Sequence, residues 1–336
     1  MNIKETLFDL SDAVSIGNIT DASDKACKIL AQYADTTQNG INVIGKIKGD
    51  SEYTLMLEAH IDEVGFVVTD VDDNGFLSVK NCGGIDLRML PARTVTIYGK
   101  QKITGVFCAT PPHLGGVKEY DNCYISKLKI DTLLGKKAKE VILVGDFVSF
   151  NQKATDLNDT RVTGKSFDNR AGVVCLLALA KRLSEKKLPF NVVFAFTDAE
   201  ELGHRGAKTT VFDVSPDEAI ALDVSFADAP DVPSNECGKL SGGAMIGMSP
   251  VLDKGISKKL IAIAKENNMP YQTEVMGSRT GTNGDVISIS KSGVKTGLVS
   301  IPLRNMHTDV EIVDIKDIEN VCDLLEKYIL GGNAKC

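Results

Sequence analysis

The sequence lacks the features that mark membrane, secreted and nucleic-acid-binding proteins. No segment comes near the stretch of about eighteen uninterrupted apolar residues that a membrane span requires. Lys and Arg are spread along a chain whose net charge is −7, so no basic stripe offers a surface to nucleic acid. Residues 1–14 have neither the basic start nor the apolar run of a signal peptide. We therefore expect no nucleic-acid or membrane partner, and a cytoplasmic location.

Two kinds of catalytic or structural motif are also missing. The eight cysteines are scattered singly and none forms a C-x-x-C pair, which argues against a zinc site built from thiolates. Reduced, mostly buried thiols are the expectation, in agreement with a cytoplasmic protein. No serine occupies a G-x-S-x-G turn, so a nucleophile elbow is excluded as well.

What remains is a chain of ordinary globular composition, with 336 residues, 43% hydrophobic residues and 30 glycines. Apolar strands at Tyr53–Ala59 and Asn191–Thr197, and a third that ends in Asp223, alternate with helical segments. One of these segments, from Ala171 to Leu183, is apolar nearly all round, as expected for a helix packed against a sheet. The pattern predicts an α/β fold with a mixed, mostly parallel sheet flanked by helices.

Residues 64–157 have a different pattern. Short alternating runs are separated by Gly, Asp-Asn-Gly and Pro turn signals, and helical periodicity is scarce. We expect a small all-β barrel here, inserted between the two halves of an α/β catalytic domain, 1–63 and 158–330. Residues 331–336 are expected to form a frayed tail.

Acids and histidines gather where strands end or helices begin. In mostly parallel sheets, active-site residues collect beyond the carboxyl ends of the strands. Glu200 and Glu201 follow one strand, although such a pair also suits the solvated first turn of a surface helix. His60 ends another strand, and Asp62 lies two residues later on the same side, where it can orient the imidazole. Asp168 stands at a helix entry, as an N-cap or as a carboxylate between two cations.

The candidate residues comprise two histidines and four acids: His60, Asp168, Glu200, Glu201, Asp223 and His307. Imidazole with carboxylate suits zinc, cobalt or manganese, whereas calcium would take oxygen ligands only. Five ligands and a spare carboxylate exceed the needs of one catalytic zinc ion. They fit two metal ions about 3.5 to 4 Å apart that share a bridging carboxylate.

Eight short blocks, in order along nearly the whole chain, resemble the signature of the glutamyl-aminopeptidase family, metallopeptidase family 42 of clan MH. Members include the tetrahedral TET aminopeptidases, and some members carry an endoglucanase label. The blocks are HIDEVGF, GGIDLRML, ATPPHL, FDNRAG, EELGHRGA, ALDV, TGTNGD and PLRNMHT.

The resemblance implies a role for each candidate residue. His60, Asp168 and Asp223 would hold one metal ion, and Asp168, Glu201 and His307 the other, so that Asp168 is the bridge. Asp62 would orient His60. Glu200 would be the general base that takes a proton from the bridging water and delivers it to the leaving amine. The resemblance also implies a cis peptide bond after Asp168.

Two positions depart from the family pattern. Asn283 stands where the family usually has Asp, and its neighbours Gly284 and Asp285 differ as well. His204 stands where an apolar or uncharged residue is more usual. Of two interpretations, a residue that lines the pocket and a histidine on the surface of a helical turn, we favour the second. Neither position belongs to the expected ligand set.

The resemblance therefore implies a cytoplasmic aminopeptidase with two divalent ions, zinc or cobalt with manganese as a further choice, that removes N-terminal residues from peptides. It also implies that the inserted barrel contributes to dimer contacts and that dimers assemble into a hollow particle, often a dodecamer. A related metal-dependent carboxypeptidase or deacylase, and a scaffold without catalysis, stay open as alternatives. Glycoside hydrolysis fits poorly, because it needs two metal-free carboxylates.

Overall fold

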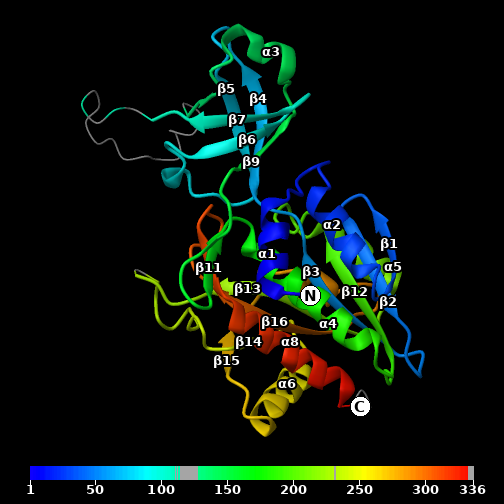
Figure 1. The fold of residues 1–336 in the computed structure, drawn as a ribbon. Coiled ribbons are helices and arrows are strands. Elements are labelled where there is room, and N and C mark those ends of the chain that lie inside the picture. The colour runs from blue at the N-terminus through cyan, green and yellow to red at the C-terminus, as the bar shows by residue number, and fades with distance from the viewer. Residues whose placement is uncertain (110, 112, 114–127, 231, 332–336) are drawn as a thin grey trace.

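The computed structural model describes residues 1–109, 111, 113, 128–230 and 232–331. The chain forms an α/β part that carries both termini and a β barrel that stands on it (Figure 1). The expected tail 331–336 lies outside the described residues except for Gly331.

The α/β part is built on one eight-stranded sheet in the order β1-β2-β12-β3-β13-β16-β14-β15. Four neighbouring pairs are parallel and three are antiparallel, so the predicted mixed, mostly parallel sheet is confirmed. The strands are β1 Asp35–Asn39, β2 Asn42–Ile47, β3 Thr54–His60, β12 Asn191–Thr197, β13 Glu218–Phe226, β14 Ala244–Met248, β15 Tyr271–Val275 and β16 Lys295–Leu303.

Helices cover both faces of this sheet, because its central strands are apolar on both sides. One face packs against α1 Ile3–Asp12, α2 Asp21–Leu30, α4 Phe167–Ser184, α6 Lys254–Glu266 and α8 Ile315–Leu330. The other face packs against α5 Arg205–Val214 and the short α7 Gly284–Ile287. As predicted, α4 is buried nearly all round.

The barrel is closed, with six strands in the order β4-β5-β8-β7-β6-β9. Its core is separate from that of the α/β part and includes Phe66, Phe107 and Phe150 in edge-to-face contact. The predicted inserted barrel is thus confirmed. Its elements are β4 Gly65–Val71, β5 Leu77–Cys82, β6 Thr94–Tyr98, β7 Lys102–Phe107, β8 Ile130–Asp131, the short α3 Ala138–Val141 and β9 Phe147–Phe150.

The strands differ from the simple sequence pattern in three places. Asp223 does not end its strand, because β13 continues beside β16 as far as Phe226. Pro302 lies within β16, although proline usually ends a strand. It is tolerated because β14 pairs with β16 only up to Ser300, so this edge of β16 needs no N–H at Pro302. A separate three-stranded sheet, which the sequence pattern did not predict, joins β10 Thr155–Asp156, β11 Arg161–Gly164 and β17 Glu311–Asp314.

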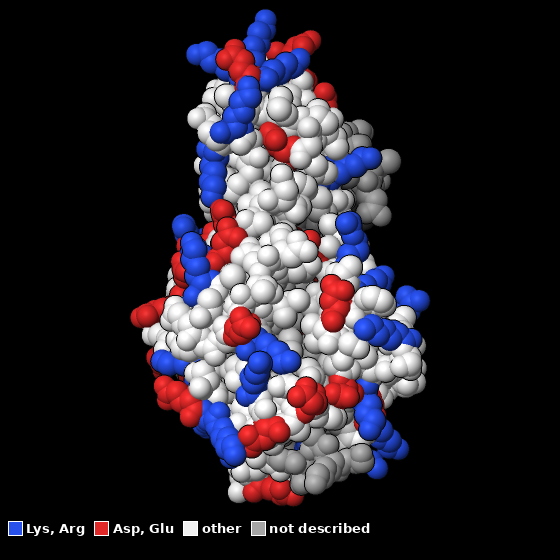
Figure 2. Space-filling view, turned by 90° about the vertical axis from the view of Figure 1, so that its right-hand side faces the viewer, with Lys and Arg blue, Asp and Glu red and all other residues white. Residues whose placement is uncertain are grey.

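The surface and the cysteines add two observations. Basic and acidic side chains are interspersed on the face shown in Figure 2, which narrows between the barrel and the α/β part. Within the described ranges, no helix has the length and apolar character of a membrane span. The cysteines found free are Cys27, Cys82, Cys108, Cys175, Cys237 and Cys322, while Cys123 and Cys336 lie outside the described residues.

Candidate active site

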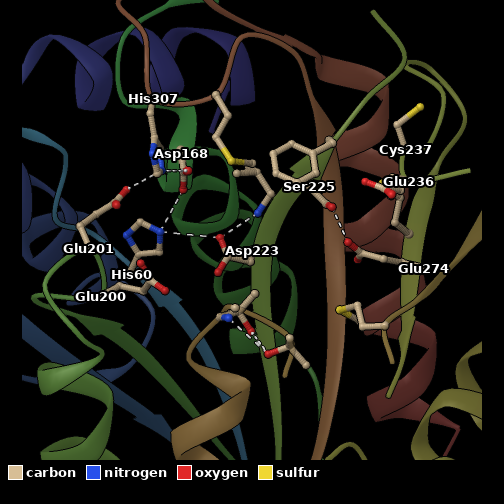
Figure 3. Close-up of a pocket in the computed structure, with 18 of the residues that line it drawn as sticks. His60, Asp168, Glu200, Glu201, Asp223, Ser225, Glu236, Cys237, Glu274 and His307 are labelled. Atoms are coloured by element: carbon tan, nitrogen blue, oxygen red, sulfur yellow. Dashed lines mark hydrogen bonds and ion pairs between the residues drawn. The ribbon is translucent and has the colours of Figure 1, made fainter. Parts of the chain in front are cut away.

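A cavity of about 660 Å³ opens beside the carboxyl ends of the central strands. All six candidate residues line it, and Figure 3 shows them gathered on one side: His60, Asp168, Glu200, Glu201, Asp223 and His307. They come from five separate segments of the α/β part, so the fold brings together what the sequence holds far apart.

His60 is the last residue of β3, and its buried ring lies between carboxylates. Its Nδ1 is 3.4 Å from Oδ1 of Asp62, which lies behind it, away from the cavity. Its Nε2 faces the cavity, 3.0 Å from Oδ1 of Asp168 and 3.6 Å from Oδ1 of Asp223. Nε2 is therefore the nitrogen available to a ligand, and Asp62 lies where it can fix the ring's orientation.

Asp168 is a carboxylate shared between two imidazoles. Oδ1 faces His60, and Oδ2 lies 3.3 Å from Nε2 of His307. The N-cap interpretation is wrong, because the backbone at Asp168 is not helical and the capping bond comes from Asn169, whose Oδ1 accepts the N–H of Gly172 over 3.1 Å. The peptide bond between Asp168 and Asn169 is cis, as the resemblance implied.

Glu200 and Glu201 lie in a tight turn after β12, before α5 begins at Arg205. The interpretation as a solvated first turn of a helix is therefore wrong. Their backbone N–H groups donate to the two oxygens of Asp62, over 3.1 and 3.3 Å. The two side chains then diverge: Oε1 of Glu201 lies 3.2 Å from Nε2 of His307, while Oε1 of Glu200 lies 3.0 Å from Nδ1 of His204.

Glu311 is a functional candidate that the sequence reasoning missed. Its buried carboxylate accepts the backbone N–H of Asp168 over 3.0 Å and that of His307 over 2.8 Å. It thereby holds two cavity residues that lie far apart in the chain. Its place four residues after His307 was the available signal, but an acid at the start of a short strand carries no mark of such a role.

The barrel also reaches this site. A Cβ added to Gly83 would lie 3.4 Å from Oε2 of Glu201, and one added to Gly84 would lie 3.4 Å from Nδ1 of His307. Gly83 has a φ of +85°, a conformation that glycine adopts without strain. This glycine pair lets the barrel loop approach the cluster without filling it.

The six candidate residues include four carboxylates and only two imidazoles, so their negative charges are not fully balanced. Burial raises the pKa of Asp223 to about 7 and also raises the pKa of Glu201. Burial acts to lower the pKa of His307, but hydrogen bonds to Asp168 and Glu201 raise it to about 11. Buried carboxylates of this kind are stabilised by a bound cation.

The donor atoms fit two metal ions. Within each of two groups of three residues, the possible ligand atoms lie within 4.8 Å of one another. One group is His60, Asp168 and Asp223, and the other is Asp168, Glu201 and His307, so Asp168 is common to both. Glu200 and Glu201 also group with His60. Mixed imidazole and carboxylate donors favour zinc, cobalt or manganese over calcium.

His204 lines the cavity, which corrects the interpretation of this residue as a surface histidine. Asn283, the other departure from the family pattern, is buried beside it. The sequence reasoning missed Glu58, because a single acid within an apolar strand gives no sign of a role in a site. Glu58 is buried, and burial raises its pKa to about 8.

Comparisons with known proteins agree with this geometry. The model of the M42 glutamyl aminopeptidase family matches residues 41–324. The lysyl aminopeptidase of Pyrococcus furiosus is 29% identical over 86% of this chain and 84% of its own. An aminopeptidase from the archaeon Desulfurococcus kamchatkensis superposes with a TM-score of 0.91 at 30% identity, covering 98% of this chain and 94% of its own. The TET1 peptidase of Pyrococcus horikoshii, which can assemble into a tetrahedron or a large octahedral shell, gives 0.86 at 29% identity, covering 98% and 99%.

Proposed function

The chain belongs to the M42 glutamyl aminopeptidase family, and from this premise we propose that it is a metal-dependent aminopeptidase that removes N-terminal residues from peptides. The observation that carries the proposal is the placement of Asp168 between two imidazoles, each with further acids beside it, at the wall of one cavity. Ordinary core packing gives no reason for such a cluster of buried acids and histidines.

The two groups of donors would each hold one divalent ion, zinc or cobalt, with manganese as a further choice. His60, Asp168 and Asp223 would hold the first, and Asp168, Glu201 and His307 the second. When bound, the ions would act as Lewis acids that polarise the peptide carbonyl and activate water. Asp62 would keep Nε2 of His60 turned toward the cavity, and Glu311 would hold the backbone of Asp168 and His307.

Glu200 is the proposed general base. It lines the cavity and belongs to neither of the two groups that share Asp168, so in this arrangement of the ions its carboxylate is left to carry a proton. In this role Glu200 takes a proton from the attacking water. It then delivers this proton to the leaving amine, the backbone nitrogen of the second residue of the peptide, as the peptide bond breaks. The turn that carries it is held by the bond from its N–H to Asp62.

Glu200→Gln tests the proposal. The amide cannot accept the proton, so cleavage of aminoacyl-p-nitroanilides should slow by a factor on the order of 100 or more while two metal ions per chain remain bound. Elemental analysis counts the metal, and Glu185→Gln at the exposed end of α4 is the control. A fully active Glu200→Gln enzyme would show that the base is assigned wrongly.

The wild-type chain separates the alternatives. An aminopeptidase should lose activity with a chelator and regain it with zinc, cobalt or manganese. Cleavage only of N-acylated or C-terminal substrates would instead favour a related deacylase or carboxypeptidase on the same ligands. Absence of metal uptake together with absence of hydrolysis would favour a scaffold protein.

The proposal extends to the assembled protein. By analogy with the TET1 peptidase, we propose a homo-oligomer in the cytoplasm, with residues 64–157 as the dimerisation domain of a catalytic domain made of 1–63 and 158–330, and dimers assembling into a dodecamer. A hollow particle of this kind would admit short or unfolded peptides. The exposed apolar side chains on the barrel support this assignment.

A further inference from the structure

His204 and Asn283, two polar residues beside the proposed general base, lie in contact. Nδ1 of His204, in the turn before α5, is 3.2 Å from Oδ1 of Asn283, which precedes α7. The segments are far apart in sequence, and α5 and α7 pack together on the same face of the sheet. The two residues therefore form one feature of the site.

Asn283 is held in one orientation by buried partners. Its Nδ2 donates to Oε1 of Glu58 over 2.7 Å and to Oγ1 of Thr197 over 3.1 Å. Both partners lie in the core, on β3 and β12. Because the amide nitrogen is turned to Glu58, the amide oxygen must face His204.

This arrangement also fixes the proton of His204. Nδ1 faces the amide oxygen of Asn283 and, 3.0 Å away, Oε1 of Glu200. An amide oxygen can only accept, so Nδ1 must carry the hydrogen, which then also points toward the carboxylate of Glu200. The hydrogen bond to Glu200 in turn raises the pKa of His204.

The backbone keeps the ring in this place. The N–H groups of Gly203 and His204 both donate to the carbonyl oxygen of Glu200, over 2.9 and 3.1 Å, which closes a tight turn. His204 has a φ of +62°, in the left-handed region, at the N-cap of α5. The turn thus brings the His204 ring back onto the side chain of Glu200.

We propose that His204 is a positioning residue for the general base: Glu58 orients Asn283, Asn283 and the turn orient His204, and His204 holds the Glu200 carboxylate in its catalytic direction. The proposal rests on the proposed function of Glu200. It makes the three side chains behind Glu200, those of His204, Asn283 and Glu58, a single unit.

The test compares kcat, KM and metal content in a small set of variants. His204→Leu removes the donor and should lower kcat roughly 10-fold with KM and two bound metal ions unchanged. His204→Gln restores an N–H donor and should recover part of the loss. Asp213→Asn, at the exposed far end of α5 and away from the turn, is the control and should keep wild-type kcat.

A double-mutant cycle isolates the proposed unit. Asn283→Ala alone should lower kcat, but it should add little when His204 is already Leu, because the interaction it acts through is gone. A residue needed only for folding would instead lower the melting temperature and the metal content along with kcat, which is why both are recorded for every variant.

The outcomes are distinct. Unchanged kcat in both His204→Leu and His204→Gln overturns the proposal, as do independent, additive losses in the cycle. Full activity in Glu200→Gln, or no hydrolysis of any aminoacyl substrate by the wild-type protein, would count against the proposed function itself.

Discussion

At the scale of single residues, Asp62 shows how one buried carboxylate can organise a site without facing the cavity. Its two oxygens accept the N–H groups of Glu200 and Glu201, and one of them also lies 3.4 Å from Nδ1 of His60. Three cavity residues, one at the end of β3 and two in the turn after β12, are therefore held by one side chain. The proposed base and a ligand of each metal ion depend on it.

Asp62→Asn tests this dependence. Asparagine has one acceptor oxygen where aspartate has two, so an N–H of Glu200 or Glu201 loses its partner and the His60 ring loses its carboxylate. We expect metal affinity or kcat to fall by about 10 to 100-fold, measured by metal titration and by hydrolysis of aminoacyl-p-nitroanilides. Asp198→Asn is the control at a neighbouring acid, which burial and the Asp62 charge give a pKa of about 6. Equal metal affinity and kcat in Asp62→Asn and wild type would contradict the role.

Whether the sequence identified a site residue depended on the position of that residue relative to the strands. His60, Glu200 and Glu201 were predictable because they follow apolar strands, and parallel strands bring such positions to one edge of the sheet. Glu58 and Glu311 were not, because each acts through a neighbour that only the folded chain supplies. Whether His204 faces the surface or the cavity depends on a left-handed turn that its sequence does not reveal.

At the scale of elements, a buried ionic cluster joins the barrel to the α/β part. The carboxylate of Glu63, just before β4, accepts a hydrogen bond from the hydroxyl of Ser149 on β9 over 2.9 Å. It also forms an ion pair with Nζ of Lys165 over 2.6 Å. Arg170 on α4 lies 3.9 Å from the same carboxylate, and Ser166 also donates to it. All five residues are buried, so these charges depend on one another.

Glu63→Gln should therefore be strongly destabilising. It removes the carboxylate that pairs with buried Lys165 and Arg170, at an expected loss of about 3 to 5 kcal/mol in the free energy of unfolding. Denaturant unfolding measures the loss, and Glu63→Gln combined with Lys165→Met should recover part of it. Asp156→Asn breaks the exposed pair with Lys4 and should change stability by less than about 1 kcal/mol. An equally small effect of Glu63→Gln would show that the cluster does not stabilise the junction.

The elements themselves were largely predictable, with clear exceptions. Continuous apolar runs identified the central strands, because a strand buried on both faces is apolar at every position. Alternating runs between turn signals identified the barrel, because a strand buried on one face is apolar at every second position. The course of β13 beyond Asp223 and of β16 through Pro302 depended on neighbouring strands instead. Pairing with a partner overrides the local pattern at strand ends.

At the scale of the whole molecule, the barrel exposes apolar side chains at the end that lies away from the cavity. Leu133 before α3 is 90% exposed, and Leu143 and Val144 after it are 52% and 68% exposed. Figure 1 places α3 at the far end of the barrel from the α/β part. Apolar side chains gathered on a surface mark contacts with other chains, which suits a dimerisation domain.

Charge introduced at this end of the barrel should break the assembly. Val144→Glu combined with Leu133→Glu would place two carboxylates in the proposed contact, where they lose hydration without gaining a partner. Mass photometry should show a particle near twelve times the chain mass for the wild type and much smaller species for the variant. Hydrolysis of aminoacyl-p-nitroanilides should continue in those species, because all the proposed ligands lie in one chain.

The control variant is Ile289→Glu, which alters a side chain that is 74% exposed on the α/β part. If that variant dissociates and the barrel variant does not, the contacts lie on the α/β part and the barrel is not the dimerisation domain.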